Sequence, residues 1–491
     1  MEFTDTFATE SQVEEYRTRG YNDDVLPKTA EKRSMGIGNY FTLWMGSVHN
    51  IPNYTAVGGF LFLGLAPINV MLALVISALI VAAFMVANGM AGSRYGIPFA
   101  MHLRSTYGNL GAKLPGFLRG CVAAIAWFGL QTYTGSAALM VLIGKIWPGY
   151  LELGGGMEFL GINLPAFIAF TVFWVLNVAI GFGGGGVLNK FTAVLSPLIY
   201  VVVGGMTVWA IVVNGGIAPI LDYGAAANAD IAVNVPFAFL MIFNSVIAVW
   251  AAPGASASDF TQNAKSSRTQ ALGQSLSLLV AYVVFAFCSV IILLGGSLHY
   301  GVQEWNIVTL IDRWDSLPAV VVATATFLLT TISTNATGNI IPAAYQLSAL
   351  FPKKITYKTG VLIASIISFV IMPWKLMENS ASIYLFLNTI GAVLGPVAGV
   401  MVANYFAIAR QKIDLNALYM DDAHKDPSNP YYGLNVPAYV ATIAALVISL
   451  SGNLIPQLAF VSNISWFVGF ICAALIYLAL RIPQLRAAKS E

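Results

Sequence analysis

Long apolar stretches separated by short polar segments run through almost the whole chain. A helix needs roughly 20 apolar residues to cross a bilayer, and the sequence predicts twelve such spans. The regular alternation of apolar and polar positions that marks membrane β-strands is absent. We therefore expect an all-α polytopic membrane protein with transmembrane helices at about 40–66, 68–91, 115–146, 163–182, 189–213, 236–255, 270–296, 317–350, 358–375, 382–408, 436–452 and 462–481.

Composition agrees with a chain embedded in lipid. Of its 491 residues, 58% are hydrophobic and only 9% are charged, so charges are too few to cover a soluble surface of this size. The net charge of +2 gives no reason to expect a nucleic-acid partner. No nucleophile-base pair, zinc-binding cluster or paired carboxylates occur within the spans, so we expect neither an enzyme nor a cofactor other than a coupling ion.

Basic residues are distributed unevenly between the two sides. If both termini lie on one side, that side receives all of the 24 Lys and Arg residues except Lys145, Arg313 and Lys375, which predicts that both termini are cytoplasmic. This count assigns Arg119 to the cytoplasmic side and leaves no basic residue facing the middle of the bundle. Residues 1–38 are polar and lack the apolar core of a cleavable signal peptide. We expect a cytoplasmic tail at 1–38, one transporter domain at 39–482 and a second cytoplasmic tail at 483–491, in the cytoplasmic (inner) membrane.

Two spans are interrupted at comparable places, at 47–53 and at 250–256. Pro52 and Pro253 each remove a backbone hydrogen bond, and freed backbone groups at membrane depth are tolerated only beside a cavity. Simple kinks are the alternative, but the two breaks lie five spans apart, as expected for inverted repeats whose first helices are discontinuous. We expect repeats at about 39–213 and 236–408, with extra helices at 436–481.

Polar side chains inside two spans predict a pocket at membrane depth. Trp127 and Gln131 share one face of the third span, and Asn335 and Asn339 share one face of the eighth, because residues at i and i+4 stack. Packing or an interhelical hydrogen bond explains any one of them; their conjunction favours binding. Indole planes and neutral amides suit a small, planar, neutral molecule rich in carbonyl and N–H groups. With the residues beside the two breaks, the candidate substrate-binding residues are Asn50, Trp127, Gln131, Trp250, Asn335 and Asn339.

Hydroxyl-bearing residues on the eighth span suggest a cation site. Ser333 and Thr334, with Thr330 one turn earlier, present oxygen atoms beside the proposed pocket. Serine and threonine often bond back to their own helix, but unwound backbone at a broken helix supplies further oxygen ligands for Na⁺. His49 is the one titratable group near the pocket and is able to accept a coupling proton, although a neutral hydrogen-bonded histidine is more common.

Five segments carry a resemblance to a known family. They are LWMGSVHNIPN at 43–53, WFGLQ at 127–131, the segment 250–261 that ends in SDFT, ISTNATGN at 332–339 and PWKLME at 373–378. With these motifs, which are specific in combination, nearly the whole chain resembles the nucleobase:cation symporter family and, within it, the bacterial allantoin permeases. The resemblance implies the inverted-repeat transporter fold and import of a hydantoin-like or purine-derived compound.

The resemblance also implies roles for individual residues. The family's stacking tryptophans fall on Trp127 and Trp250, and its substrate amides fall on Asn50, Gln131 and Asn339. Its sodium ligands fall on the carbonyls of Gly46, His49 and Thr330 and on the hydroxyls of Ser333 and Thr334. The hydantoin transporters have a hydrophobic residue where this chain has His49, and this departure leaves a proton as the alternative coupling ion.

The leading hypothesis is a secondary symporter that imports allantoin, a neutral ureide, by alternating access and with Na⁺ or H⁺ as coupling ion. A second hypothesis keeps the mechanism but changes the substrate to hydantoin, uracil or another nucleobase. A passive channel is disfavoured, because a stacked, amide-lined site implies binding tight enough to slow conduction. The expected partners are a small substrate and the lipid bilayer, and we expect a monomer.

Overall fold

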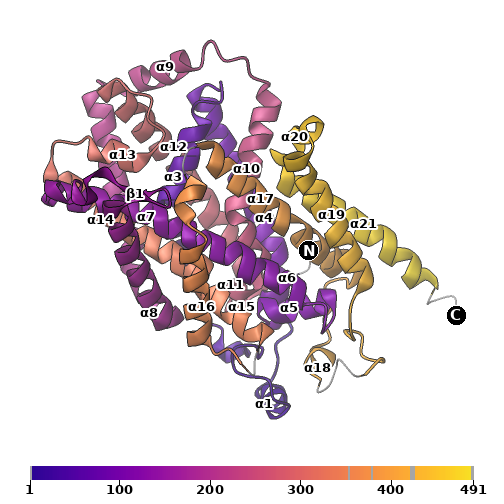
Figure 1. The fold of residues 1–491 in the computed structure, drawn as a ribbon. Helices are drawn as coiled ribbons and strands as arrows, with labels where there is room; N and C mark the ends of the chain where they lie inside the picture. The colour runs from indigo at the N-terminus through magenta and orange to yellow at the C-terminus, as the bar shows by residue number, and fades with distance from the viewer. Residues whose placement is uncertain (1–2, 352–353, 378–379, 421–425, 488–491) are drawn as a thin grey trace.

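In the computed structural model, the protein is a bundle of helices (Figure 1). The structure describes residues 3–351, 354–377, 380–420 and 426–487. Within these residues, ten helical stretches are long and apolar enough to cross a bilayer. Of the remaining predicted spans, the first is divided between two short helices and the ninth is the 14-residue α16 (Tyr357–Val370). The prediction of an all-α membrane protein is confirmed, and the count of twelve spans stays a prediction.

The first half of the chain holds the first five predicted spans. Its helices and strands are α1 (Glu10–Thr18), α2 (Ile37–Val48), α3 (Ile51–Phe60), α4 (Pro67–Tyr95), α5 (Phe99–Tyr107), α6 (Lys113–Phe117), the π-helical η2 (Leu118–Ala123), α7 (Ala124–Ile146), β1 (Glu158–Phe159), β2 (Ile162–Asn163), α8 (Leu164–Val213) and α9 (Ile217–Ala227). Short 3₁₀ helices lie at Ala30–Lys32, Pro148–Tyr150 and Leu153–Gly156. β1 and β2 pair antiparallel in a small hairpin.

The helix α8 contains both the fourth and the fifth predicted spans. The helix continues through the glycine-rich segment between these two spans. Its parts Leu164–Gly183 and Leu195–Val213 are each long and apolar enough to cross a membrane. Because 50 residues are more than twice what one crossing requires, α8 accounts for two spans.

The second half holds the remaining spans. Its helices are α10 (Val235–Ala255), α11 (Ala257–Thr261), α12 (Ser267–Tyr300), α13 (Ile307–Asp312), α14 (Leu317–Asn335), the π-helical η5 (Ala336–Ile340), α15 (Ile341–Leu350), α16, α17 (Ser380–Ala403), the π-helical η7 (Asn404–Ile408), α18 (Leu415–Leu418), α19 (Val436–Leu454), α20 (Ala459–Ser462) and α21 (Ser465–Ala487). Two 3₁₀ helices lie at Pro373–Met377 and Pro456–Leu458. Figure 1 shows α19 to α21, drawn in yellow, along one edge of the bundle.

The first predicted break is present. α2 ends at Val48 and α3 begins at Ile51, with His49 and Asn50 between them. Asn50 is extended (φ −127°, ψ 161°), and its side chain caps α3 by accepting a hydrogen bond from the Asn53 N–H. Pro52 occupies the first turn of α3, where its missing N–H costs nothing. An amide cap followed by a proline therefore starts a new helix in the middle of the span.

The second predicted break falls later than the proline. α10 continues through Pro253 to Ala255, and only Ser256 (φ −95°, ψ 28°) interrupts the helix before the five-residue α11. Pro253 removes one hydrogen-bond donor, which the packed α10 tolerates. The interruption thus lies at the last residue of the predicted segment, and its second part is much shorter than α3.

The N-terminal tail is folded onto one side of the bundle. The Tyr16 ring of α1 stacks on the Tyr419 ring at 4.6 Å. Met35 exchanges backbone hydrogen bonds with Asn263 and Lys265, just after α11. The tail, the end of the broken α10–α11 span and α18 therefore share one side, called the N-terminal side below. Of the sequence predictions, Glu378 in the motif at 373–378 and the last residues of the 483–491 tail lie outside the described residues.

Candidate functional site

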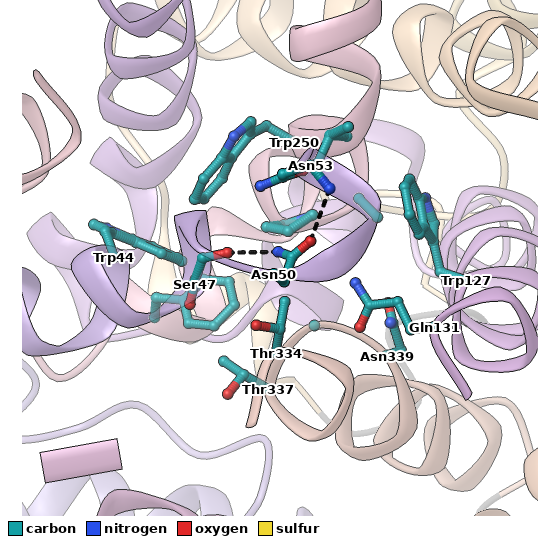
Figure 2. Close-up of a pocket in the computed structure, with 15 residues that line it drawn as sticks. Trp44, Ser47, Asn50, Asn53, Trp127, Gln131, Trp250, Thr334, Thr337 and Asn339 are labelled. Atoms are coloured by element: carbon teal, nitrogen blue, oxygen red, sulfur yellow. Dashed lines mark hydrogen bonds between the residues drawn. The ribbon is translucent and has the colours of Figure 1, made fainter. Parts of the chain in front are cut away.

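A pocket opens beside the break between α2 and α3 (Figure 2). Its empty volume, including the part open to solvent, is about 510 Å³. Among the described residues, none of the 15 that line it is charged. They are Trp44, Ser47, Asn50, Asn53, Trp127, Gln131, Val249, Trp250, Ala252, Pro253, Phe260, Thr334, Thr337, Gly338 and Asn339.

The structure brings five of the six candidate substrate-binding residues to this pocket. They are Asn50, between α2 and α3, Trp127 and Gln131 of α7, Trp250 of α10 and Asn339 of η5. The sixth candidate, on α14, lies behind the pocket wall, as described below. Segments far apart in the sequence therefore meet at one uncharged cavity.

Two amides hold the break in place. The Asn50 side chain donates to the Ser47 carbonyl at 2.7 Å and accepts from the Asn53 N–H at 3.0 Å (Figure 2). The Asn53 side chain donates to the Val48 carbonyl at 2.7 Å. These bonds replace the helical bonds that the interruption removes. Each amide keeps part of its hydrogen-bonding capacity, since a primary amide has two N–H donors and a carbonyl that accepts two bonds.

Aromatic rings form two walls of the pocket. Trp250 donates its indole N–H to the Tyr282 hydroxyl at 2.6 Å and meets Trp44 edge to face at 5.2 Å. Trp127 meets Phe386 edge to face at 5.0 Å. Figure 2 shows Trp127 and Trp44 on opposite sides of the cavity, with Trp250 above Asn50. The anchored rings offer flat apolar faces to a planar molecule.

Several buried polar atoms at the pocket have no partner within the described part of the chain. These atoms are the indole nitrogens of Trp44 and Trp127 and the side-chain carbonyl oxygen of Gln131. Buried polar groups in folded proteins are nearly always hydrogen-bonded. Two donors and one acceptor around a cavity fit a ligand that carries both carbonyl and N–H groups.

Asn335 supports a pocket residue from behind. Its side-chain oxygen accepts a hydrogen bond from the Asn339 amide at 2.8 Å. Its own N–H₂ group donates to Thr132 Oγ1 and to Asn177 Oδ1, both at 3.1 Å. Because this network fixes one N–H of Asn339, Asn335 orients the Asn339 side chain.

The break also frees two carbonyl oxygens that were predicted as cation ligands. In an unbroken helix, the Gly46 and His49 carbonyls would accept from the N–H groups of Asn50 and Asn53. Those N–H groups bond instead to the Val48 carbonyl, at 3.1 Å, and to the Asn50 side chain. Free carbonyl oxygens beside a broken helix are suitable ligands for Na⁺.

Of the predicted cation ligands on α14, only Thr334 lines the pocket. Thr334 lines the pocket and donates its hydroxyl hydrogen back to the Thr330 carbonyl at 2.9 Å, which leaves its oxygen lone pairs available. Ser333 and Thr330 are buried and do not line the pocket. α2 and α14 are in contact, so these hydroxyls and the freed carbonyls belong to neighbouring elements. The chemistry of this donor set fits a hard cation.

The ring of His49 is enclosed by neighbouring aromatic side chains. It is fully buried, its Nδ1 lies 3.0 Å from the Tyr54 hydroxyl, and the rings of Tyr200 and Phe285 pack edge to face against it. His49 is absent from the pocket lining. The His49 ring is therefore hydrogen-bonded to a neighbouring side chain within the bundle.

Sequence reasoning did not select five of the lining residues that carry polar or aromatic side chains: Trp44, Ser47, Asn53, Phe260 and Thr337. Thr337 could have been found, because it lies three residues after Thr334 on the same helical face. Trp44 and Phe260 each lie within about two turns of a break, but nothing in their spacing distinguishes them from core aromatics.

The expectation that no basic residue faces the middle of the bundle is wrong. Arg119, on η2, is fully buried. It donates hydrogen bonds to the carbonyls of Ala252 and Gly338, both of which line the pocket. The distribution of basic residues placed Arg119 on the cytoplasmic side, because it lies near the start of the predicted span 115–146 and nothing local in the sequence reveals its distant partners.

Comparison with known proteins gives a consistent result. A sequence model of the family described as permease for cytosine/purines, uracil, thiamine, allantoin matches residues 27–469. The chain is 56% identical over 474 residues to the putative allantoin permease of Escherichia coli strain K12, covering 96% of this chain and 97% of that protein. It is 36% identical over 460 residues to the allantoin permease of Bacillus subtilis strain 168, covering 94% and 92% of the two chains.

The fold is similar to that of a solved transporter. Mhp1, a nucleobase-cation-symport-1 family transporter in a closed conformation with bromovinylhydantoin bound, superposes with a TM-score of 0.75 at 23% sequence identity. The match covers 96% of each chain. At this level of identity, the similarity establishes the architecture of the bundle.

Proposed function

The chain belongs to the nucleobase:cation symporter family, the permeases for cytosine and purines, uracil, thiamine and allantoin, and we propose that it imports allantoin together with a cation. The resemblance inferred from the sequence motifs is thereby confirmed. The family consists of membrane transport proteins rather than enzymes. The choice of substrate rests on the chemistry of the pocket and on the names of the relatives.

The observation that carries the proposal is an uncharged pocket with unpaired buried polar atoms between aromatic walls. Allantoin is neutral and joins a hydantoin ring to a ureido group, so it presents several carbonyl and N–H groups. Its ring would stack on Trp127 or Trp250, and its carbonyl and N–H groups would pair with Gln131 and Asn339. The two relatives named above as allantoin permeases support the same choice.

Transport would follow from closure of the pocket on alternate sides. The broken α2–α3 and α10–α11 spans border the pocket, and their short halves are the elements best able to tilt without disturbing a whole helix. Repeats at about 39–213 and 236–408 would supply the two related halves of this movement. The uneven distribution of Lys and Arg favours a cytoplasmic N-terminal side, hence the tails 1–38 and 483–491 in the cytoplasm and the domain 39–482 in the inner membrane. We expect a monomer, since one chain contains the whole pocket.

The coupling cation would be Na⁺, held by oxygen atoms at the break. The carbonyls of Gly46 and His49, released from their helical partners, would provide two ligands. The α14 side would add the Thr330 carbonyl and the hydroxyls of Ser333 and Thr334. The enclosed ring of His49, which is outside the pocket lining, makes a proton the less favoured ion.

Binding to the purified protein tests the substrate. We expect saturable binding of radiolabelled allantoin that unlabelled allantoin displaces and that uracil and hydantoin displace at higher concentration. Displacement by uracil or hydantoin at lower concentration than allantoin would transfer the proposal to those substrates. Absence of saturable binding of all three would contradict it.

Two variants test the coupling ion in proteoliposomes. Thr334→Ala should reduce sodium-driven accumulation of allantoin more than it reduces exchange of internal for external allantoin. His49→Ala serves as the matched comparison. Sodium coupling predicts that this variant retains sodium-driven accumulation of allantoin. If Thr334→Ala is silent and His49→Ala loses accumulation while keeping exchange, a proton is the coupling ion.

A further inference from the structure

Three irregular parts of the bundle converge on Arg119. The residue lies on π-helical η2, and its partners lie at the interruption after α10 and on π-helical η5. Its Nε donates to the Ala252 carbonyl at 2.7 Å and to Ser256 Oγ at 3.2 Å, and its Nη2 donates to the Gly338 carbonyl at 2.9 Å. π-helical turns inside α-helices are rare and occur frequently at functional sites.

The environment of Arg119 is unusual for a charged group. The side chain is fully buried in a predicted span, and among the described residues no carboxylate lies within ion-pair distance of it. Its Nη1 has no hydrogen-bond partner in the same part of the chain. An ionisable residue inside a membrane bundle is costly and by default indicates function.

The acceptors explain why an arginine is held here. Pro342 stands four residues after Gly338 and has no N–H, so the Gly338 carbonyl lacks its usual helical donor. The carbonyl of Ala252 lies in the last turn of α10, where the helix dipole favours a positive charge. A planar guanidinium carries five N–H donors and can serve both acceptors at once, which the ammonium group of lysine does less well.

The two acceptors belong to different groups of helices. α7, α8 and α14 pack on one another, with η2 against α7 and η5 against α14. α10 packs on α4, and α4 packs on α12. Arg119 is therefore anchored to η5 in its own group and reaches across to the end of α10 in the other. Ala252 and Gly338 both line the pocket, and Ala252 lies in the last turn of α10, towards the N-terminal side.

We propose that Arg119 is a positioning residue that keeps the pocket closed on the N-terminal side by tying the end of α10 to η5. The bonds to Ala252 and Ser256 must open for a bound molecule to leave on that side, while the bond to Gly338 stays within one group of helices. This inference rests on the proposed function, because it assigns the closed and open states to a transport cycle.

Accessibility of a pocket cysteine tests the proposal without any substrate. The reporter is Ser47→Cys, in a chain whose Cys121, Cys288 and Cys472 are replaced by serine. A membrane-impermeant thiol reagent is applied to sealed vesicles of each orientation. We expect Arg119→Gln to raise the labelling rate about tenfold from the N-terminal side and to leave the rate from the opposite side no higher than that of the parent.

Matched variants separate this role from simple destabilisation. Lys113→Gln, on the same span and outside the pocket lining, should label at the parent rate. Arg119→Lys should give an intermediate rate, and Ser256→Ala, which removes one acceptor, should raise it about threefold. A parent rate for folded Arg119→Gln, or an equal rise from both sides, would overturn the proposal. If Arg119→Gln does not fold, Arg119→Lys and Ser256→Ala decide by the same criterion.

The proposed function and this inference can fail separately. If the unmodified protein does not bind allantoin, the proposed substrate is wrong, but the labelling result still tests the role of Arg119. If the protein binds allantoin but the Arg119 variants are labelled at the parent rate, the proposed role of Arg119 is wrong and the proposed substrate stands.

Discussion

Single residues of the pocket divide into those that hold backbone and those that face the cavity. Asn50 binds backbone on both sides of its amide, and Asn335 orients Asn339. Gln131 has an unpaired buried oxygen among the described residues, and Trp127 an unpaired indole N–H. Removing a residue of the first kind should disturb the shape of the site, whereas removing one of the second kind should change what binds.

Trp127→Ala should weaken allantoin binding at least several-fold. The substitution removes a ring held edge to face against Phe386 and takes away a buried indole N–H that has no partner within the described residues. Aromatic contacts contribute about 0.5–1.5 kcal/mol beyond area burial. Titration with radiolabelled allantoin measures the change, and Trp147→Ala, at the exposed end of α7, is the matched control. Unchanged affinity in Trp127→Ala would remove this ring from the site.

Asn339→Leu should alter selectivity as well as affinity. The amide is held in one orientation by Asn335, so its remaining groups can be paired only by a ligand of matching shape. A buried polar group left unpaired costs about 1–3 kcal/mol. Competition experiments should show that the variant loses discrimination between allantoin and uracil. The same preference ratio as in the unmodified protein would show that Asn339 does not read the substrate.

Asp259 should make stability depend on pH. Its carboxylate accepts the Phe99 N–H at the start of α5, at 2.8 Å. Burial raises the pKa of this carboxyl to about 6, against the opposing effects of the Phe99 N–H and of Arg119. Because the folded state holds this proton more tightly than the unfolded state, the stabilisation is complete below about pH 4 and is lost as the pH rises through about 6.

The difference between two variants isolates this titration. The melting temperature of the unmodified protein should fall relative to that of Asp259→Asn as the pH rises from about 4 to above 6. Asp230→Asn, at an exposed loop aspartate, should follow the unmodified protein. Parallel curves for all three proteins would show that Asp259 does not titrate in this range.

At the scale of elements, the two interrupted spans differ in what interrupts them. The first break combines an extended Asn50, its cap of α3 and Pro52 in the first turn, all within a few residues of sequence. The second break lies at Ser256. Arg119, from another span, donates hydrogen bonds to the Ser256 hydroxyl and to the Ala252 carbonyl. The first break could therefore be predicted from the sequence in detail, whereas the second was predicted only to within residues 250–256 and not to Ser256.

Asn50→Ala should lower stability and weaken binding together. Loss of an N-cap costs about 1 kcal/mol, and here it also releases the Ser47 carbonyl beside the pocket. Asn163→Ala is the matched control, since Asn163 caps α8 through the Ala166 N–H far from the cavity. Thermal unfolding should show similar losses for both variants, and only Asn50→Ala should bind allantoin less tightly. Equal affinities would separate the cap from the site.

At the scale of the whole molecule, the sequence predicts the helical membrane fold and most of the pocket but not the bonds that join distant segments. The candidate residues were found because polar groups stand out in apolar spans. Arg119 was misplaced, because its partners lie 133 and 219 residues away and are backbone carbonyls, which any residue type can supply. Only the folded bundle shows that this arginine is enclosed.

The central claim is that the protein moves allantoin by coupled transport, and accumulation in proteoliposomes measures this directly. With an inward sodium gradient, internal radiolabelled allantoin should rise above the external concentration, saturate with substrate, and fall back when the sodium gradient is dissipated. A protonophore should leave this accumulation intact. Entry that stops at equal concentrations under both sodium and proton gradients would contradict the account, because it would describe a passive pathway and not a symporter.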